Sequence, residues 1–383
     1  MNYNFDQILD RRASDSIKWN LFEEDVLPLW VADMDFLSPP EVLDALRKRI
    51  DHGVFGYSKT QENTKLAVQN WLSIRHGWEV QEDAILIIPG VVQAFNVAAA
   101  AFSQPGDSVL IQTPAYHPYF SVSSNAQLNQ IDCPLVPDSN GYYSLDSSLF
   151  KNSLHPNTRT FMLCNPHNPT GRVFDELELL SMAQSCIENN TVICSDEIHS
   201  DIVHPGHKHI PIASISSEIA NMSVTMVSTT KSFNLAGLKS SAVIISNPRL
   251  RELFSNQLSG FVGSVNILGE IALAAAYEHG SGWITELLNY LEGNRQYLLD
   301  FVANELPDIN IYPPEGTYLG WLDCSEMDLD DPADFFLKQA RVGLNSGEWF
   351  GENYSHHVRI NFGCPRELLA TALERIKLAV LSR

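Results

Sequence analysis

A lysine in a hydroxyl-rich loop is the residue of this chain with the clearest potential for chemistry. Lys231 stands in the stretch 228–237, between two apolar runs, 223–227 and 241–245, that predict buried strands. An ammonium group that loses solvation has a lowered pKa, and its free amine is a nucleophile toward a carbonyl carbon. A surface lysine in a Ser/Thr-rich turn is the alternative interpretation of this stretch.

The neighbours of Lys231 suit a phosphate group. The hydroxyls of Ser228 and Thr230 can bind phosphate oxygens, and Lys239 supplies a second cation eight residues after Lys231. A nucleophilic lysine beside a phosphate-binding loop indicates pyridoxal 5'-phosphate (PLP) held as a Schiff base. Motifs elsewhere in the sequence are needed to choose between a cofactor site and a simple surface turn.

The composition is that of a globular protein with an acidic surface. A chain of 383 residues with 44% apolar and 19% charged residues predicts a large core and roughly two to three domains. The net charge of −21 makes nucleic acid and anionic membranes improbable partners. Six cysteines without a CxxC pair predict reduced thiols, and no apolar run is long enough to span a membrane. We therefore expect a cytoplasmic protein.

Short apolar runs alternate with helical patterns from about residue 80 to 245. Six runs are candidate strands: 84–88, 108–112, 160–163, 191–195, 223–227 and 241–245. Helical patterns over 92–103 and 174–189 lie between them. This alternation predicts an α/β domain with a mainly parallel sheet, of the seven-stranded type, sandwiched by helices. Ligands bind beyond the carboxyl ends of such strands, so the residues that follow each run are candidate site residues.

A second, smaller α/β domain is expected in the C-terminal part. A long amphipathic pattern over 283–306 leads into it. Its predicted strands are 317–323 and 357–362, and its predicted helices are 332–341 and 365–381. A short helix is expected over 41–50, and the N-terminal residues are expected to pack with the small domain. The predicted division is a large domain of residues 46–282 and a small domain of residues 1–45 and 283–383.

The turns after the first three strands carry groups suited to a flat, phosphorylated ring. Gly90 opens a helix whose free N–H groups form a possible phosphate site. Tyr116 lies between two prolines and can stack on a heterocycle, although a core aromatic is equally compatible. Asn168, in a turn with two Asn-Pro steps, presents an amide donor to a phenolate oxygen.

Two charged residues stand where a charge needs a partner. Asp196 follows the fourth strand, and a protonated pyridine nitrogen would be its partner; a helix N-cap is the alternative. Arg359 lies inside an apolar strand, and its fork matches a carboxylate of a substrate or of an internal Asp or Glu. Histidines 199, 204, 207 and 209 suggest a metal site only weakly, because their spacing matches no ordinary zinc pattern.

These motifs together resemble the fold type I PLP-dependent enzymes of the class I/II aminotransferase superfamily. The resemblance runs from about residue 28 to the C-terminus and is most specific at 165–171, 195–199, 228–237 and 358–363. Within the superfamily, Pro-Leu-Trp-Val-Ala-Asp-Met-Asp-Phe at 28–36 and Asp-Glu-Ile-His-Ser-Asp at 196–201 resemble the cystathionine β-lyase branch of bacterial carbon–sulfur lyases.

The resemblance implies a role for each candidate residue around the cofactor ring. Lys231 would be the Schiff-base lysine and the proton carrier. Asp196 would pair with the pyridine nitrogen, Asn168 would bind the phenolate oxygen, and Tyr116 would stack on the ring. His199 would also contact the cofactor, and it stands where many aminotransferases have a tyrosine that hydrogen-bonds the phenolate.

The resemblance also implies the phosphate and substrate contacts. The phosphate would be held by the amides of Val91 and Val92 and by Ser228, Thr230 and Lys239, of which Lys239 stands where arginine is usual. Arg359 would hold the substrate α-carboxylate. Tyr57 would reach the phosphate of the neighbouring subunit, which implies a homodimer with shared sites.

The activity implied is the α,β-elimination of cystathionine or a related S-substituted cysteine to a thiol, pyruvate and ammonia. An aminotransferase would use the same lysine, and only the motif at 28–36 favours the lyase. A PLP-binding regulatory protein without catalysis is a third possibility, although the charge of −21 argues against contact with DNA.

Overall fold

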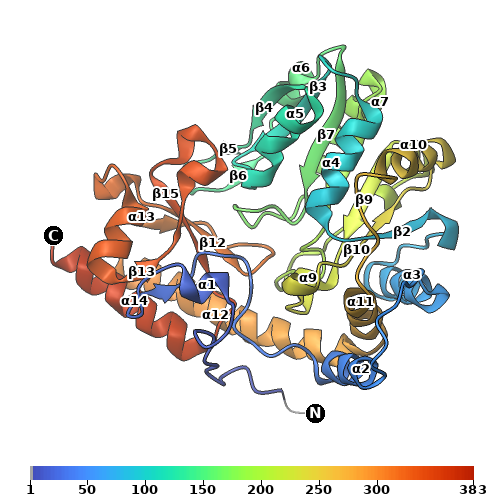
Figure 1. Ribbon diagram of the computed structural model, residues 1–383. Helices are drawn as coiled ribbons and strands as arrows, with labels where there is room; N and C mark the ends of the chain where they lie inside the picture. The colour runs from blue at the N-terminus through green and yellow to red at the C-terminus, as the bar shows by residue number, and fades with distance from the viewer. Residues whose placement is uncertain (1–2) are drawn as a thin grey trace.

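A seven-stranded sheet forms the larger part of the computed structural model, which describes residues 3–383 (Figure 1). Its strands, in spatial order, are β2 (Ile85–Ile88), β10 (Ser241–Ile244), β9 (Ser223–Val227), β8 (Val192–Asp196), β7 (Thr158–Cys164), β3 (Ser108–Thr113) and β4 (Asn129–Pro134). Strand β10 is antiparallel to both of its neighbours, and all other neighbouring pairs are parallel. The predicted mainly parallel sheet is therefore confirmed.

Helices cover both faces of this sheet, and the strands are apolar on both sides as a result. One face packs against α4 (Val91–Phe102), α5 (Phe120–Ala126) and α10 (Pro248–Leu258). The other face packs against α6 (Ser147–Ser153), α7 (Glu176–Asn189) and α8 (Ser217–Asn221). Val109 and Ile111 of β3 belong to the first cluster and Leu110 to the second. Two covered faces explain the continuous apolar runs of the sequence.

A smaller antiparallel sheet forms the C-terminal part of the molecule. Its order is β11 (Asn310–Ile311), β12 (Leu319–Asp323), β15 (His357–Asn361) and β14 (Asn345–Ser346). The accompanying helices are α12 (Ser281–Glu305), α13 (Pro332–Phe335) and α14 (Arg366–Leu381). Figure 1 shows α12 running along the base of the molecule from α11 (Ile267–His279) toward this sheet.

The N-terminal part of the chain joins both halves. Strand β1 (Leu27–Pro28) pairs in parallel with β13 (Val342–Gly343) of the C-terminal part. Helices α2 (Pro40–Asp51) and α3 (Glu62–His76) pack against α11 instead. Because α2 continues through residue 45, the predicted division of the chain at 45/46 and 282/283 stays a prediction. No helix within residues 3–383 combines the length and apolarity needed to cross a bilayer.

A buried ion cluster fixes the segment that follows helix α1 (Ile17–Asn20). Lys18 is fully buried, and its Nζ lies 2.6 Å from Oδ2 of Asp35. Arg11 binds Oδ1 of Asp35 at 2.6 Å and Oδ2 of Asp33 at 2.9 Å. The indole N–H of Trp19 donates to Asp35 at 2.7 Å. A buried carboxylate is costly unless it is paired and hydrogen-bonded, and Asp35 meets both conditions.

Replacement of Lys18 by methionine should destabilise the fold markedly. The substitution leaves the buried carboxylate of Asp35 without its closest ammonium partner, which costs about 3–5 kcal/mol; we expect the lower value because Arg11 remains. Urea unfolding measures the change. The control is Arg47→Ala, which breaks a largely exposed pair with Asp44 and should cost about 0–1 kcal/mol. Equal losses for both variants would contradict this account of the cluster.

Candidate active site

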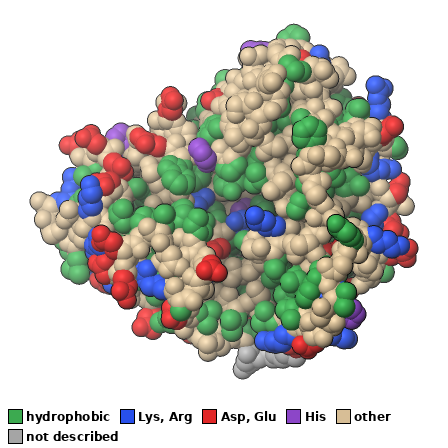
Figure 2. Space-filling model, in the orientation of Figure 1, with side chains coloured by type: hydrophobic (Ala, Val, Ile, Leu, Met, Phe, Trp, Pro, Cys, Tyr) green, Lys and Arg blue, Asp and Glu red, His purple; other side chains and the backbone are tan. Residues whose placement is uncertain are grey.

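A cavity of about 580 Å³ lies at the carboxyl ends of the parallel strands, where the larger sheet meets the C-terminal part. Figure 2 shows the hollow on this face of the molecule, between its two halves, with hydrophobic side chains around it. The volume falls in the range of roughly 300–1,000 Å³ that is usual for small-molecule sites. Ten of the predicted site residues line it: Val91, Val92, Tyr116, Asn168, Asp196, His199, Thr230, Lys231, Lys239 and Arg359.

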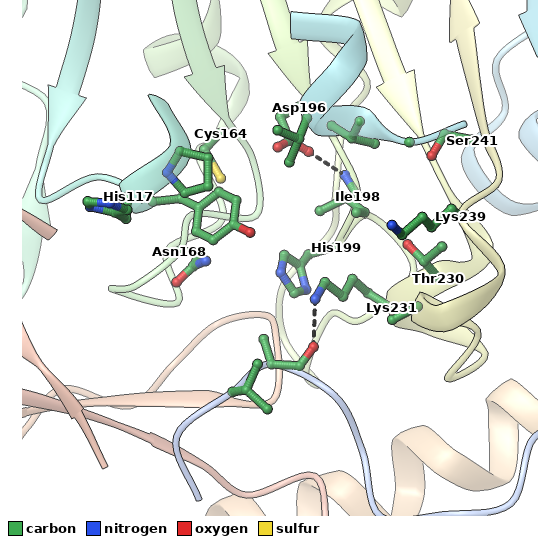
Figure 3. Close-up of a pocket in the computed structure, with 18 of the residues that line it drawn as sticks. His117, Cys164, Asn168, Asp196, Ile198, His199, Thr230, Lys231, Lys239 and Ser241 are labelled. Carbon is green, nitrogen blue, oxygen red and sulfur yellow. Dashed lines mark hydrogen bonds between the residues drawn. The ribbon is translucent and has the colours of Figure 1, made fainter. Parts of the chain in front are cut away.

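Lys231 lies on the short helix α9 (Thr229–Ser232), which directly follows β9. Ser232 fastens this helix, because its hydroxyl donates to Asp201 at 2.7 Å. The Nζ of Lys231 donates to the carbonyl of Ala32 at 2.6 Å (Figure 3). Burial, and next the positive charge of Arg359, lower the pKa of Lys231 to about 8. The amine is therefore much closer to its free, nucleophilic form than that of an exposed lysine.

Asp196, the last residue of β8, presents a buried carboxylate to the same cavity. The hydroxyl of Tyr119 donates to its Oδ2 at 2.7 Å, and the backbone N–H of Ile198 donates to Oδ1 at 3.1 Å. Burial raises the pKa of Asp196 to about 6, although these two hydrogen bonds act in the opposite direction. A cationic partner would relieve this cost of burying the carboxylate.

Arg359 presents a guanidinium without a carboxylate partner. It is 4% exposed, and within the described chain it makes no ion pair. Its Nη1 donates to Oδ1 of Asn168 at 2.9 Å, and its Nη2 donates to the carbonyl of Trp30 at 2.8 Å and to Oδ1 of Asn345 at 2.5 Å. Its Nε is buried without a hydrogen-bond partner. The internal salt bridge considered from the sequence is absent, so this cation is suited to an anionic ligand.

One end of the cavity offers donors to a phosphate-sized anion. Gly90 has a φ of 135°, and helix α4 starts directly after it, so the first N–H groups of the helix lack helical acceptors. Strand β10 runs opposite to its neighbours, so its first residue, Ser241, reaches the same end. The Ser241 hydroxyl is buried without a partner, and Thr230 and Lys239 lie beside it (Figure 3).

Three predicted site residues take positions that the sequence did not specify. Ser228 does not line the cavity; its hydroxyl caps α9 by accepting from the N–H of Thr230 and donates to the carbonyl of Ser240. Tyr57 is fully exposed between α2 and α3 and does not line the cavity of its own chain. His199 lines the cavity, and burial lowers its pKa well below the ordinary value, so the ring is neutral.

Residues 30–32 line the cavity, and the segment 30–36 to which they belong is held by one asparagine from each half of the molecule. Asn234, three residues after Lys231, accepts from the N–H of Met34 and donates to the carbonyls of Met34 and Phe36. Asn361, two residues after Arg359, donates to the carbonyls of Val31 and Asp33 at 2.7 Å each. This segment is the one whose sequence resembles the lyases, and the structure places it against both Lys231 and Arg359.

Several residues of the site carried no predicted role. Tyr119, which holds Asp196, and Ser241 could have been suspected because each borders a predicted strand or its turn. Trp30 is 8% exposed and lines the cavity as well. Trp349 and Phe350 come from a 3₁₀ helix, Gly347–Phe350, which no sequence pattern predicts. The four histidines considered for a metal make separate contacts, such as His209 with Glu197 at 2.9 Å and His204 with the carbonyl of Thr317.

Comparison with known proteins identifies the family. The model of the aminotransferase class I and II family matches residues 24–376. The chain belongs to this family. It is 39% identical to the cystathionine beta-lyase PatB of Bacillus subtilis (strain 168), over 98% of this chain and 100% of that protein.

Solved structures of family members agree with this assignment. Cystalysin from Treponema denticola, whose crystal contains a pyridoxal 5'-phosphate cofactor, is 33% identical with a TM-score of 0.96, and the match covers 100% of both chains. The PLP-bound C–S lyase from Staphylococcus hominis is 35% identical with a TM-score of 0.93, over 100% of this chain and 99% of that chain.

Acylation of Lys231 should reveal its lowered pKa. On protein freed of bound carbonyl compounds, we expect the rate to rise about tenfold per pH unit below pH 8 and to level off above it, since only the free amine reacts. Mass spectrometry of the peptide that contains residue 231 measures the rate, and Lys231→Met is the control that removes the signal. A rate that still climbs between pH 9 and 10 would show an ordinary lysine.

Proposed function

We propose that this protein is a PLP-dependent carbon–sulfur β-lyase, which converts S-substituted cysteines such as cystathionine to a thiol, pyruvate and ammonia. The observation that carries the proposal is one cavity that combines an amine of lowered pKa, a buried carboxylate and an unpaired guanidinium. The lyase names of relatives that match the whole chain favour elimination over amino transfer.

The residues of the cavity fit PLP part by part. The N-terminus of α4, with Thr230, Lys239 and the unpartnered hydroxyl of Ser241, is suited to the phosphate. Asp196 is suited to a protonated pyridine nitrogen, because a cationic partner relieves the cost of its burial. Ser228 would act through Thr230, whose hydroxyl lies 2.8 Å from its own. When bound, PLP supplies an aldehyde that reacts with amines and a ring that accepts electrons released at the substrate Cα.

The remaining contacts of the ring are proposed for side chains that line its space. Tyr116 would stack on the ring face. Asn168 would donate its amide to the phenolate oxygen, since its Oδ1 already accepts from Arg359. His199, with an Nδ1 that has no partner, is a second group able to bond that oxygen.

The chain's own groups account for substrate orientation and for proton movement. Arg359 would bind the α-carboxylate and so fix the Cα–H bond relative to the ring. The Nζ of Lys231 would take the Cα proton, because a pKa of about 8 leaves part of the amine free at neutral pH. Tyr119 would keep the Asp196 carboxylate in place through the 2.7 Å hydrogen bond.

We also propose a homodimer in which Tyr57 reaches the phosphate in the neighbouring site. The full exposure of Tyr57 and its absence from the lining of its own chain's cavity support this arrangement. The cytoplasm is the proposed location, since all six cysteines are buried and unpaired, as suits a reducing compartment.

Lys231→Ala should lower the activity severely. We expect the wild-type protein to be yellow, to lose its colour with borohydride, and to release thiol and pyruvate from cystathionine without a keto acid. Loss of the proton-transferring amine should lower the rate by about 10²–10⁴-fold. The exposed Lys208→Ala is the matched control and should keep full activity. Turnover that strictly requires a keto acid would identify an aminotransferase instead, and a colourless protein that does not bind PLP would exclude both.

Arg359→Lys should weaken the use of the amino-acid substrate while PLP stays bound. A lysine cannot form the two-point contact with a carboxylate, and a charge-assisted hydrogen bond contributes about 1.5–3 kcal/mol. We expect kcat/KM to fall roughly 10–100-fold, mainly through KM. Steady-state kinetics and the PLP spectrum measure the two effects. A normal KM in the variant would show that Arg359 does not hold the carboxylate.

A further inference from the structure

Three ring-bearing side chains line the cavity without a part in the proposed contacts to the cofactor or to the amino-acid groups of the substrate. The rings of His117 and Trp349 are 6.0 Å apart, and those of Trp30 and Trp349 are 6.4 Å apart, measured between ring centres. Trp349 is 51% exposed, whereas Trp30 is 8% exposed and packs against Phe22. We define the aromatic wall as Trp30, His117 and Trp349. None of the three has a part in the proposed contacts to PLP.

The aromatic wall lies at the substrate end of the cavity. The backbone carbonyl of Trp30 accepts from Arg359, so the wall adjoins the group proposed to hold the α-carboxylate. Figure 3 shows His117 on the side of the cavity opposite Lys239, Thr230 and Ser241, which form the phosphate end. A substituent carried on Cβ of an amino acid bound by Arg359 therefore has the wall as its neighbour.

Within the described chain, this end of the cavity presents no Asp, Glu, Lys or Arg side chain that is free to pair with a charged substituent. Among the described residues that line the cavity, the Asp, Glu, Lys and Arg side chains are Asp196, Lys231, Lys239 and Arg359. All four already have proposed partners. Cystathionine carries an ammonium and a carboxylate at its far end, and no Asp, Glu, Lys or Arg side chain that lines the cavity of its own chain remains to compensate the loss of their hydration.

We propose that the preferred substrates are cysteine conjugates with an uncharged, flat and apolar group on sulfur, such as S-benzyl- or S-arylcysteines, and that Trp349 determines this preference. The proposal rests on the lyase function above and narrows its substrate class. An aromatic group would stack on or meet the edges of the wall's rings and would exclude water from them. Trp349, half exposed at the mouth of the cavity, would cover the bound group.

The reaction with such a conjugate is a balanced elimination followed by hydrolysis. The Cα–H bond breaks and the proton passes to the Nζ of Lys231. The Cβ–S bond breaks with its electron pair on sulfur, and the sulfur takes up a proton to give the thiol. The three-carbon remainder adds one water and yields pyruvate and ammonia, so no oxidant or reductant is needed.

The test compares kcat/KM for S-benzyl-L-cysteine, S-methyl-L-cysteine and L-cystathionine in the wild-type holoenzyme. We expect S-benzylcysteine to exceed cystathionine by about tenfold or more, as one favourable aromatic contact of ~1.5 kcal/mol would give. A cystathionine value equal to or above that of S-benzylcysteine would overturn the proposal while leaving the lyase function intact. Absence of thiol from all three compounds would overturn the lyase function itself.

Two variants test the role of Trp349. Trp349→Ala should lower the S-benzyl to S-methyl ratio of kcat/KM about tenfold, and Trp349→Phe should keep most of it, because a ring is retained. The S-methyl substrate is the internal control, since a general loss of structure would lower both values together. An unchanged ratio in Trp349→Ala would overturn the assignment to Trp349, and the wild-type ranking tests the substrate class even if this variant fails to fold.

Discussion

The site depends on hydrogen bonds by which two side chains, one from each half of the molecule, fix one backbone segment. Asn234 from the Lys231 loop and Asn361 from β15 both bond to the peptide groups of residues 31–36. Ala32 in this segment and Trp30 directly before it accept hydrogen bonds from Lys231 and Arg359 through their backbone carbonyls. The buried ion pair of Lys18 and Asp35 fixes the same segment as well. The amine, the guanidinium and the floor of the cavity are thus positioned as one unit.

Burial turns this arrangement into reactivity. The same loss of hydration lowers the pKa of Lys231, raises that of Asp196 and keeps His199 neutral. Arg359 adds a positive charge that pushes the lysine further toward its free amine. The packing of the sheet and the hydrogen bonds to residues 31–36 offset the free-energy cost of burying these groups. Among the buried polar atoms without a partner, the Arg359 Nε and the Ser241 hydroxyl belong to residues that line the cavity, so these two are suited to ligands.

Much of this architecture is readable from the sequence because covered parallel strands are continuous apolar runs and their carboxyl ends converge. That rule alone brought Tyr116, Asn168, Asp196 and Lys231 together, and the structure places all four on one cavity. It missed β4, whose side chains alternate in exposure at the edge of the sheet. It also missed contacts that only tertiary structure creates, such as Tyr119 on Asp196 and Trp349 against Trp30. The capping role of Ser228 was hidden because a hydroxyl suits a phosphate and a helix terminus equally well.

The pinning of residues 31–36 also has a consequence for folding. Val31 and Asn361 lie 330 positions apart along the chain, so the hydrogen bond between them closes a very long loop. Contacts of such sequence separation form slowly, because the entropy of closing the loop is lost before the contact is made. We therefore expect this side of the cavity to be completed late in folding, after the sheet that carries Lys231.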